Sequence, residues 1–416
     1  MRGTRDYAVI TAAYWAFTLS DGALRMLVLL HLHELGFAPL ELAGLFLLYE
    51  FFGIVTNLVG GWLGARRGLK LTLTAGLGLQ VGALGMLLVD DSLLTVPWVM
   101  SAQALSGIAK DLTKMSAKSY VKLLVPSGDS GGLLRWVAWL TGSKNTLKGV
   151  GFFLGGGLLG AVGFRGACLG LAIGIGLTLL GSLVLLPSAE GGRGKTDRVL
   201  RFRSGDRRLD MLSAARLFLF ASRDAWFVVA LPVFLTTELG WSYGGVGAFL
   251  AAWIIGYGAV QAFAPALVGA RGEGGHHPDG RKLGMMSLLL LVPLSGILLS
   301  LALGAPAKPT LMIGLAGFGV IFALNSAIHS YLVVHYASED RLSQSVGFYY
   351  SANATGRLIG TALSGLLYGA WAGQGGLVAT LVAASVLVSL SAVLCIPLSR
   401  AESARVEPNG GGVTTT

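Results

Sequence analysis

The apolar residues of this chain are grouped into runs of about 20, which short polar and charged segments separate. A helix of that length crosses the hydrocarbon core of a bilayer. The pattern therefore predicts about twelve membrane-spanning helices, at residues 8–33, 40–63, 71–90, 93–113, 136–160, 165–187, 213–238, 243–269, 283–304, 310–336, 344–370 and 375–398.

The basic residues between these runs are distributed unevenly. With the runs taken as spans, nearly all of them fall on the side of the two termini, and only Arg165 and Lys308 fall on the other. Arg216, just inside the start of its span, is counted with the first group. Because Lys and Arg are enriched in cytoplasmic loops, we expect both termini to be cytoplasmic, in the inner membrane. The first run is too long for a cleavable signal.

The composition supports a membrane protein: 54% of the 416 residues are apolar and 12% are charged. Soluble domains carry about 25% charged residues. The net charge of +10 follows from the topology of the loops, so we expect no nucleic-acid partner. The two cysteines, Cys168 and Cys395, lie in separate apolar runs, and we expect neither a metal site nor a cofactor.

A charged segment at 188–212 divides the chain into two parts. We interpret it as a cytoplasmic linker between an N-terminal six-helix half, 1–187, and a C-terminal six-helix half, 213–400. The polar segment 401–416 is predicted to be a disordered tail.

The two halves share short sequence matches in the same order. Asp21, Glu-Leu-Gly at 34–36 and Gly-Ala-Arg at 64–66 correspond to Asp224, 238–240 and 269–271 at offsets of about 204 residues. Further on, Ser143-Lys-Asn145 and Gly157-Leu-Leu correspond to Ser351-Ala-Asn353 and Gly365-Leu-Leu. Parallel six-helix repeats are typical of the major facilitator fold, whose substrate site lies at mid-membrane between the halves. We therefore predict an all-α membrane protein with this fold.

The segment between the second and third spans resembles the signature loop of that superfamily. It reads Gly61-Trp-Leu-Gly-Ala65-Arg66-Arg67-Gly68-Leu-Lys70. Ala65 stands where the signature has an Asp, so the salt bridge usually assigned to that Asp is in doubt.

Several ionisable residues lie well inside the predicted spans, where a charge is costly and indicates function. Six cations outnumber four acids, so an anionic substrate would balance the excess. The predicted substrate-binding cations are Arg25, Lys110, Lys144, Lys148, Arg223 and Arg357. The predicted coupling or charge-balancing acids are Asp21, Glu50, Asp111 and Asp224.

Other interpretations of these charges stay open. Asp21 and Arg25, four residues apart on one helix, can form a purely structural pair. Glu50 can be a protonated acid that bonds a neighbour or a coupling site for protons. The series Lys114, Lys118 and Lys122 can be cytoplasmic without any substrate role. His329 and His335 are more typical of packing or helix ends than of a proton relay.

A closer resemblance rests on specific stretches of the sequence. Residues 13–26, Tyr49-Glu-Phe-Phe-Gly, 57–66, 106–118, Leu140-Thr-Gly-Ser-Lys-Asn, 147–156, 213–220 and Gly347-Phe-Tyr-Tyr resemble organoarsenical efflux permeases of the ArsJ type. The resemblance covers nearly all of 8–398 and departs mainly in the loop 271–282, which contains His276-His277.

This resemblance implies export of 1-arseno-3-phosphoglycerate, which glyceraldehyde-3-phosphate dehydrogenase forms when it uses arsenate in place of phosphate. The dehydrogenase would then be the functional partner, and the product would release arsenate outside the cell. Two oxyanion groups would suit a basic cluster in each half. The alternatives are an organophosphate or phosphate antiporter, another organic-anion exporter or a multidrug exporter of the same fold. A receptor lacks a signalling domain here, and no enzyme motif is found, so we expect no enzyme.

Overall fold

The computed structural model describes residues 2–35, 47–124, 130–186, 204–267, 278–338, 342–371 and 373–406. These parts of the chain are helical apart from turns. The elements are α1 (Arg2–Glu34), α3 (Leu47–Arg67), α4 (Leu69–Met86), η1 (Asp91–Leu93), α5 (Val96–Leu124), α6 (Ser130–Leu185), α7 (Arg207–Phe227), α8 (Ala230–Thr237), α9 (Tyr243–Ala262), α10 (Ala264–Leu267), α11 (Gly280–Leu289), α12 (Leu291–Ala302), α13 (Ala307–Tyr336), α14 (Leu342–Trp371) and α15 (Gly373–Val406).

These helices correspond to the predicted spans. α6 contains two of them, because Gly163 leaves helical geometry at φ 70° and separates its two parts. The pairs α7–α8, α9–α10 and α11–α12 each cover one predicted span. The prediction of an all-helical fold with about twelve long helical segments is therefore confirmed.

Helix composition separates two groups of spans. Seven helical stretches of the described chain are long and apolar enough to cross a membrane by that measure alone. α1, α3, α5 and α14 are also long, at 33, 21, 29 and 30 residues, but do not belong to the seven. These four helices carry most of the buried charges, so their low hydropathy reflects polar groups at membrane depth.

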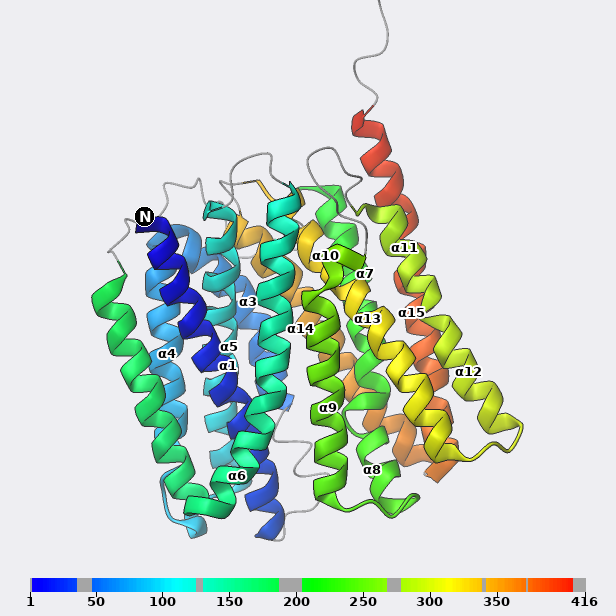
Figure 1. Ribbon diagram of the computed structural model, residues 1–416, viewed down its shortest axis with the longest axis horizontal. Coiled ribbons are helices and arrows are strands. Elements are labelled where there is room, and N and C mark those ends of the chain that lie inside the picture. The colour runs from blue at the N-terminus through cyan, green and yellow to red at the C-terminus, as the bar shows by residue number, and fades with distance from the viewer. Residues whose placement is uncertain are drawn as a thin grey trace, which may run out of the picture.

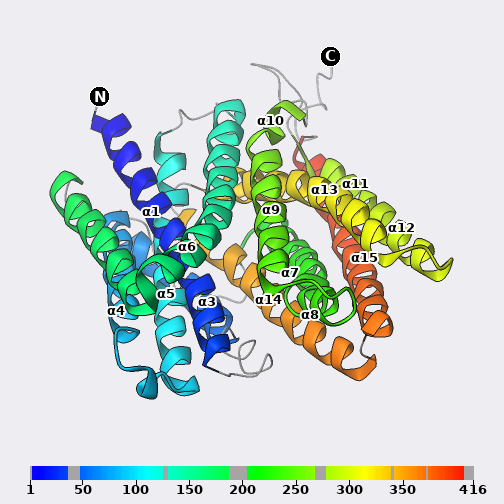
Figure 2. The same ribbon diagram turned by 60° about the horizontal axis from the view of Figure 1, so that its bottom comes forward.

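The helices form two bundles that lie side by side (Figure 1, Figure 2). α1, α3, α4, α5 and α6 pack together, and α7 to α15 form the second bundle. The main contacts between the bundles are α3 with α14 and α6 with α9. Gly142 and Gly258 bring α6 and α9 close together: a Cβ on Gly142 would lie 2.5 Å from the Ala262 nitrogen. In a bilayer, small residues of this kind allow helices to pack by van der Waals contact.

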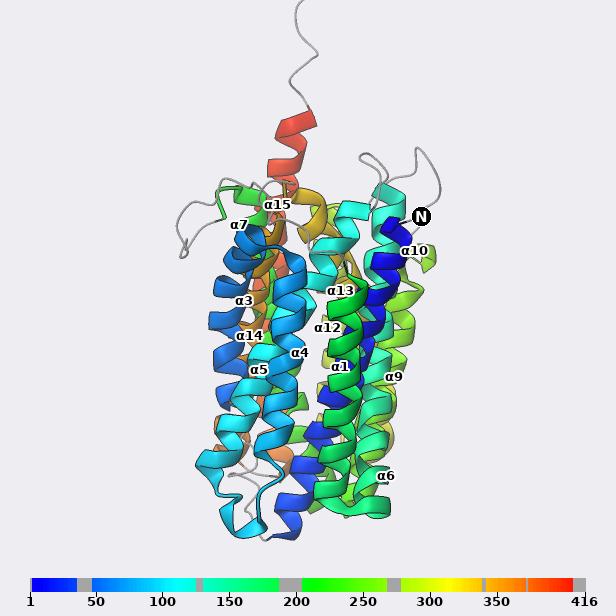
Figure 3. The same cartoon turned by 90° about the vertical axis from the view of Figure 1, so that its left-hand side faces the viewer.

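Four hydrophobic clusters in the described parts of the chain show where the two bundles join. One, here called the shared cluster, combines residues of both bundles, among them Tyr14, Leu140, Leu212 and Tyr331. It lies toward the face at which α1 begins and α15 ends, which we call the terminal face (Figure 1, Figure 3). The other three clusters each belong to a single bundle: two to the second bundle and one to the first. Among the described residues, the bundles thus share a hydrophobic core on the terminal-face side.

Several predicted segments differ from the structure or lie outside it. α7 begins at Arg207, inside the segment 188–212 predicted as a linker, whose residues 188–203 lie outside the described parts. α15 continues to Val406, into the segment predicted as a tail. Residues 407–416 lie outside the described parts. His276-His277 also lies outside them. In the signature-like loop, Gly68 has φ 89° and joins α3 to α4, a conformation that glycine adopts without strain.

Candidate functional site

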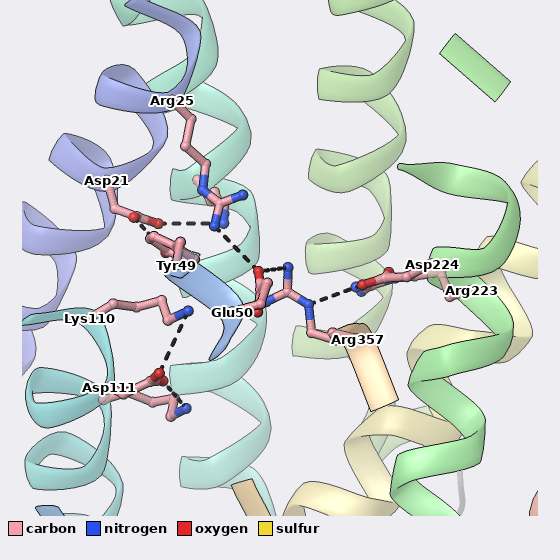
Figure 4. Close-up of polar contacts among 11 residues, drawn as sticks. Asp21, Arg25, Tyr49, Glu50, Lys110, Asp111, Arg223, Asp224 and Arg357 are labelled. Atoms are coloured by element: carbon pink, nitrogen blue, oxygen red, sulfur yellow. Dashed lines mark hydrogen bonds and ion pairs between the residues drawn. The ribbon is translucent and has the colours of Figure 1, made fainter. Parts of the chain in front are cut away.

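A chain of charged side chains crosses from one bundle to the other at mid-depth. The Oε1 atom of Glu50, on α3, forms ion pairs with two arginines. It lies 3.6 Å from Nη2 of Arg25 on α1 and 2.6 Å from Nη2 of Arg357 on α14. Arg357 also contacts Asp224 of α7 through its Nε at 3.1 Å. Figure 4 shows Glu50 and Arg357 between the groups of the two bundles. The Glu50–Arg357 ion pair therefore links the two halves of the protein.

The internal repeat of the sequence appears as two matching ion pairs. Lys148 of α6 contacts Asp21 of α1 at 3.4 Å. In the other bundle Arg357 of α14 contacts Asp224 of α7 at 3.1 Å. Asp21 and Asp224 are repeat-equivalent positions, and α6 and α14 carry the repeated Ser-x-Asn motif. Each half therefore holds a cation against an acid on its first helix.

Close helix packing brings these pairs together. A Cβ on Gly22, beside Asp21, would lie 2.5 Å from the Lys148 carbonyl oxygen. In the other half, a Cβ on Gly360 would lie 2.5 Å from the Ala221 carbonyl oxygen and 2.9 Å from the Asp224 Cβ. Larger residues at either glycine would separate the helices and lengthen the ion pairs.

A second group of charges lies on α5. Asp111 forms ion pairs with Lys110, at 3.7 Å, and with Lys114, three residues further along the helix. The ammonium group of Lys110 also lies 3.8 Å from the centre of the Tyr49 ring, and that of Lys114 lies 4.3 Å from the Tyr350 ring. Lys114 is buried and paired with Asp111, so it is not a solvent-exposed loop charge.

Tyr49 connects the charges of the N-terminal half. Its hydroxyl donates a hydrogen bond of 2.7 Å to Asp21 Oδ1, and the guanidinium of Arg25 lies 4.1 Å from its ring centre. With Lys110 also against the ring, the tyrosine contacts two cations and one acid. Sequence reasoning placed Tyr49 beside Glu50 but gave it no role. Its position within the stretch Tyr49-Glu-Phe-Phe-Gly was the signal that could have identified it.

The acids and the cations of this site differ in exposure. The side chains of Asp21, Glu50, Asp111 and Asp224 are 1–6% exposed. The cations that contact them are 10–20% exposed, namely Arg25, Lys110, Lys114, Lys148, Arg223 and Arg357. The acids thus lie beneath the cations, and the accessible surface of the site is predominantly positive.

Arg223 completes the site in the C-terminal half. It contacts Asp224 on the same helix through Nη2 at 2.5 Å and through Nε at 2.6 Å. The rings of Phe220, Phe227 and Phe322 surround its guanidinium at 4.7–6.0 Å. An arginine on aromatic faces is held in place while its remaining N–H groups stay available as donors.

The structure brings together nearly all the residues singled out from the sequence. The proposed structural pair Asp21–Arg25 is not isolated, since Asp21 also contacts Lys148 and Tyr49 and Arg25 contacts Glu50. Lys144 lies one turn before Lys148 on α6 and is half-buried.

Arg216 differs from the expectation that it belongs to the cytoplasmic charges. It is 4% exposed, on α7, where its guanidinium donates to Asn353 Oδ1 and Ser326 Oγ, both at 2.9 Å. Its place inside a predicted span was the signal that sequence reasoning passed over. His329 is fully buried, whereas His335 lies against Tyr331, its ring stacked at 5.2 Å. Within the described residues, His, Cys, Asp and Glu form no group that could hold a metal ion.

Comparison with known proteins agrees with this architecture. The model of the Major Facilitator Superfamily matches residues 212–415. A search of curated proteins gave no match.

Solved structures match over nearly the whole chain. A bacterial homologue of the iron transporter ferroportin, in an outward-facing state, has a TM-score of 0.76 at 14% identity and covers 95% of this chain and 99% of its own. The human organic anion transporter MFSD10 has a TM-score of 0.70 at 17% identity, and the match covers 94% of this chain and 99% of MFSD10. The E. coli fucose:proton symporter FucP has a TM-score of 0.68 at 13% identity, and the match covers 94% of this chain and 98% of FucP. At these identities the likeness shows a common fold.

Proposed function

We propose a substrate for this chain, which is a multi-pass secondary transporter of the major facilitator superfamily and not an enzyme. The substrate is a small organic anion with two oxyanion groups, and the direction of transport is export. The specific candidate is the phosphorylated organoarsenical 1-arseno-3-phosphoglycerate, which the resemblance to ArsJ-type permeases suggests.

The observation that carries this proposal is the exposure of the cations above buried acids. Six cations of the site share four carboxylates, so the site has a formal excess of two positive charges when all are ionised. Uncompensated charge at membrane depth is unfavourable. An anion that reaches the exposed faces of the cations would compensate the excess, and a neutral or cationic substrate would not.

The positions of the cations fit two separate oxyanion groups. In the N-terminal half Arg25, Lys110 and Lys148 surround Tyr49 and Asp21. In the C-terminal half Arg223 and Arg357 meet at Asp224. Arg offers a planar fork to a phosphate-like or arsenate-like group, and Lys adds a point charge. We assign one oxyanion to each half.

A test in cells distinguishes export of this substrate from other routes of arsenic resistance. In cells that lack other arsenic exporters, we expect tolerance to arsenate, and only when glyceraldehyde-3-phosphate dehydrogenase is co-expressed to supply the substrate. Arsenite tolerance should not change, because trivalent arsenic needs thiolates and the described site has none. Equal protection against arsenite, or protection without the dehydrogenase, would contradict the proposal.

The alternative with the same chemistry is an organophosphate:phosphate antiporter. Arginines on the first helix of each half, Arg25 and Arg223, support it, because each carries donors suited to phosphate. Proteoliposomes loaded with inorganic phosphate distinguish the two. Stimulation of organophosphate uptake by internal phosphate indicates the antiporter, and its absence favours the exporter.

We also propose that the terminal face is cytoplasmic and that the protein lies in the inner membrane. The asymmetry of basic residues along the sequence supports this orientation. Reporter fusions in the segment 188–212 and at the C-terminus should both give cytoplasmic signals. A periplasmic signal from either fusion would overturn the topology.

A further inference from the structure

A second basic group lies apart from the central site, toward the terminal face. Arg216 precedes Asp224 by eight residues on α7, a distance of about 12 Å along the helix axis. It is 4% exposed. The central cations Arg25, Arg223 and Arg357 each contact a carboxylate. Within the described residues, Arg216 contacts none.

The partners of Arg216 are neutral. Its Nε donates to Asn353 Oδ1 at 2.9 Å, and its Nη1 donates to Ser326 Oγ at 2.9 Å. Its guanidinium lies 3.9 Å from the Phe220 ring centre and 5.5 Å from that of Tyr349. Neutral acceptors satisfy N–H groups but do not neutralise the charge, and a buried cation without a counter-charge is strongly unfavourable.

Two further polar side chains beside Arg216 are buried without hydrogen bonds in the described structure. The ring nitrogens of His329 and the hydroxyl of Tyr349 have no partner, and both residues are fully buried. The His329 ring lies 6.3 Å from the Tyr349 ring, the same ring that faces Arg216. Buried polar groups in folded proteins are nearly always paired. A guanidinium, an imidazole and a phenol hydroxyl are all donors that suit an oxyanion.

We propose that Arg216, His329 and Tyr349 form a second oxyanion subsite, which binds the phosphate-like end of the substrate when the terminal face is open. In this structure the group is buried at the shared cluster, to which Tyr349 itself belongs, and is therefore closed toward the terminal face. A transporter of this fold alternates access by moving one half against the other. Opening the terminal face would expose Arg216 before the central site and give the anion its first binding position.

A polar network ties the subsite to the boundary between the halves. Asn145 of α6, in the N-terminal half, donates to Gln261 Oε1 of α9 at 2.6 Å. Gln261 in turn donates to Ser326 Oγ at 3.3 Å, the oxygen that also accepts from Arg216. Separation of α6 from α9 would therefore break a contact one step from Arg216, so that opening and anion binding involve the same groups.

The assignment of this anion as the transported substrate rests on the proposed function, but anion binding can be tested without transport. The probe is inorganic phosphate. Ser330→Cys, one turn beyond Ser326 on α13, is introduced after Cys168 and Cys395 are replaced by Ala. A membrane-impermeant maleimide is applied from the terminal face of oriented proteoliposomes. Phosphate should slow alkylation of the introduced thiol, and chloride at equal ionic strength should not.

Variants locate the bound phosphate. Arg216→Gln should raise the phosphate concentration needed for protection about tenfold, the loss expected for a charged hydrogen bond. Arg208→Gln, the same change two turns earlier on α7, is the matched control and should leave protection unchanged, because Arg208 pairs with Asp206. Lys148→Gln in the central site should also leave it unchanged, even if it abolishes transport.

Several outcomes would overturn the subsite. They are an absence of alkylation from the terminal face, equal protection with and without Arg216, and loss of protection in Lys148→Gln alone. If Arg216→Gln does not reach the membrane, His329→Gln replaces it, with the same expected rise. A transport defect in Lys148→Gln and Arg357→Gln with intact protection of the introduced thiol would support both proposals. Normal transport in both variants would refute only the proposed function.

Discussion

The ion pair between Glu50 and Arg357 gives the sharpest test of how the central site works. Its two charged atoms lie 2.6 Å apart, on helices of different halves. At an effective dielectric constant of about 20, the gross attraction of two unit charges at this distance is about 6 kcal/mol. Removal of each ion from water costs several kcal/mol. A net contribution of about 1.5–3 kcal/mol, that of a charged hydrogen bond, is therefore expected.

If Arg357 binds the organic anion, Arg357→Gln removes one charged hydrogen bond to it and should raise KM roughly tenfold to hundredfold. Glu50 would keep Arg25 at 3.6 Å, and Asp224 would keep Arg223, so we expect the protein to fold and reach the membrane. Glu50→Gln should lower KM and also lower the maximal rate. Without the acid, Arg25 and Arg357 hold the anion more tightly and release it more slowly.

The double variant Glu50→Gln/Arg357→Gln decides between the two roles of the arginine. If Arg357 binds substrate, the double variant stays as impaired as Arg357→Gln. If it only neutralises Glu50, the double variant regains near-normal KM, and that recovery would refute the reasoning. Transport in proteoliposomes gives KM, with protein amount and thermal unfolding as controls. Arg208→Gln is the matched control, since it removes an arginine paired outside the site.

Three further outcomes follow from single contacts. Tyr49→Phe removes the 2.7 Å hydrogen bond to Asp21 but keeps the ring beneath its two cations, so KM should rise only about twofold to tenfold. Arg223→Lys replaces a fork by a point charge and should raise KM more than Lys148→Arg does, as measured in the same assay. Gly360→Ala should lower the unfolding temperature because its Cβ would meet the Ala221 carbonyl oxygen, whereas Gly365→Ala, where nothing lies within 4 Å, should not.

The fold could be predicted from the sequence because the bilayer imposes a single length scale on every helix. Runs of about 20 apolar residues marked the spans, and the repeat between Asp21 and Asp224 indicated two equivalent halves. Helix ends were less predictable: α15 extends to Val406, where no apolar pattern marks it.

The membership of the central site was predictable, but its pairing was not. Burial of an ionisable side chain in a membrane span costs free energy, so such a residue is expected to have a function. Glu50, Lys148 and Arg357 could therefore be identified without a structure. Spacing along one helix suggested Asp21 with Arg25, whereas the structure also brings Lys148 from α6 and Glu50 from α3 to this pair. Contacts between helices depend on packing, which local spacing does not specify.

Arg216 shows a second limit of the sequence. A basic residue near the start of a span can face the loop or the bundle interior, and charge counting treats both alike. Its burial depends on acceptors from α13 and α14, Ser326 and Asn353, which lie more than 100 positions further along the chain.

One hydrophobic cluster joins the two bundles, so changes within it can shift the equilibrium between closed and open states of the terminal face. If the terminal face opens as proposed, the shared cluster divides, whereas the other three clusters, each within one half, stay intact. Tyr331 is fully buried in the shared cluster, and a smaller side chain at this position would weaken the closed arrangement. Each 1.4 kcal/mol lost there would shift the ratio of the two states about tenfold. The transport rate would therefore respond to the packing of the shared cluster as well as to the charges of the central site.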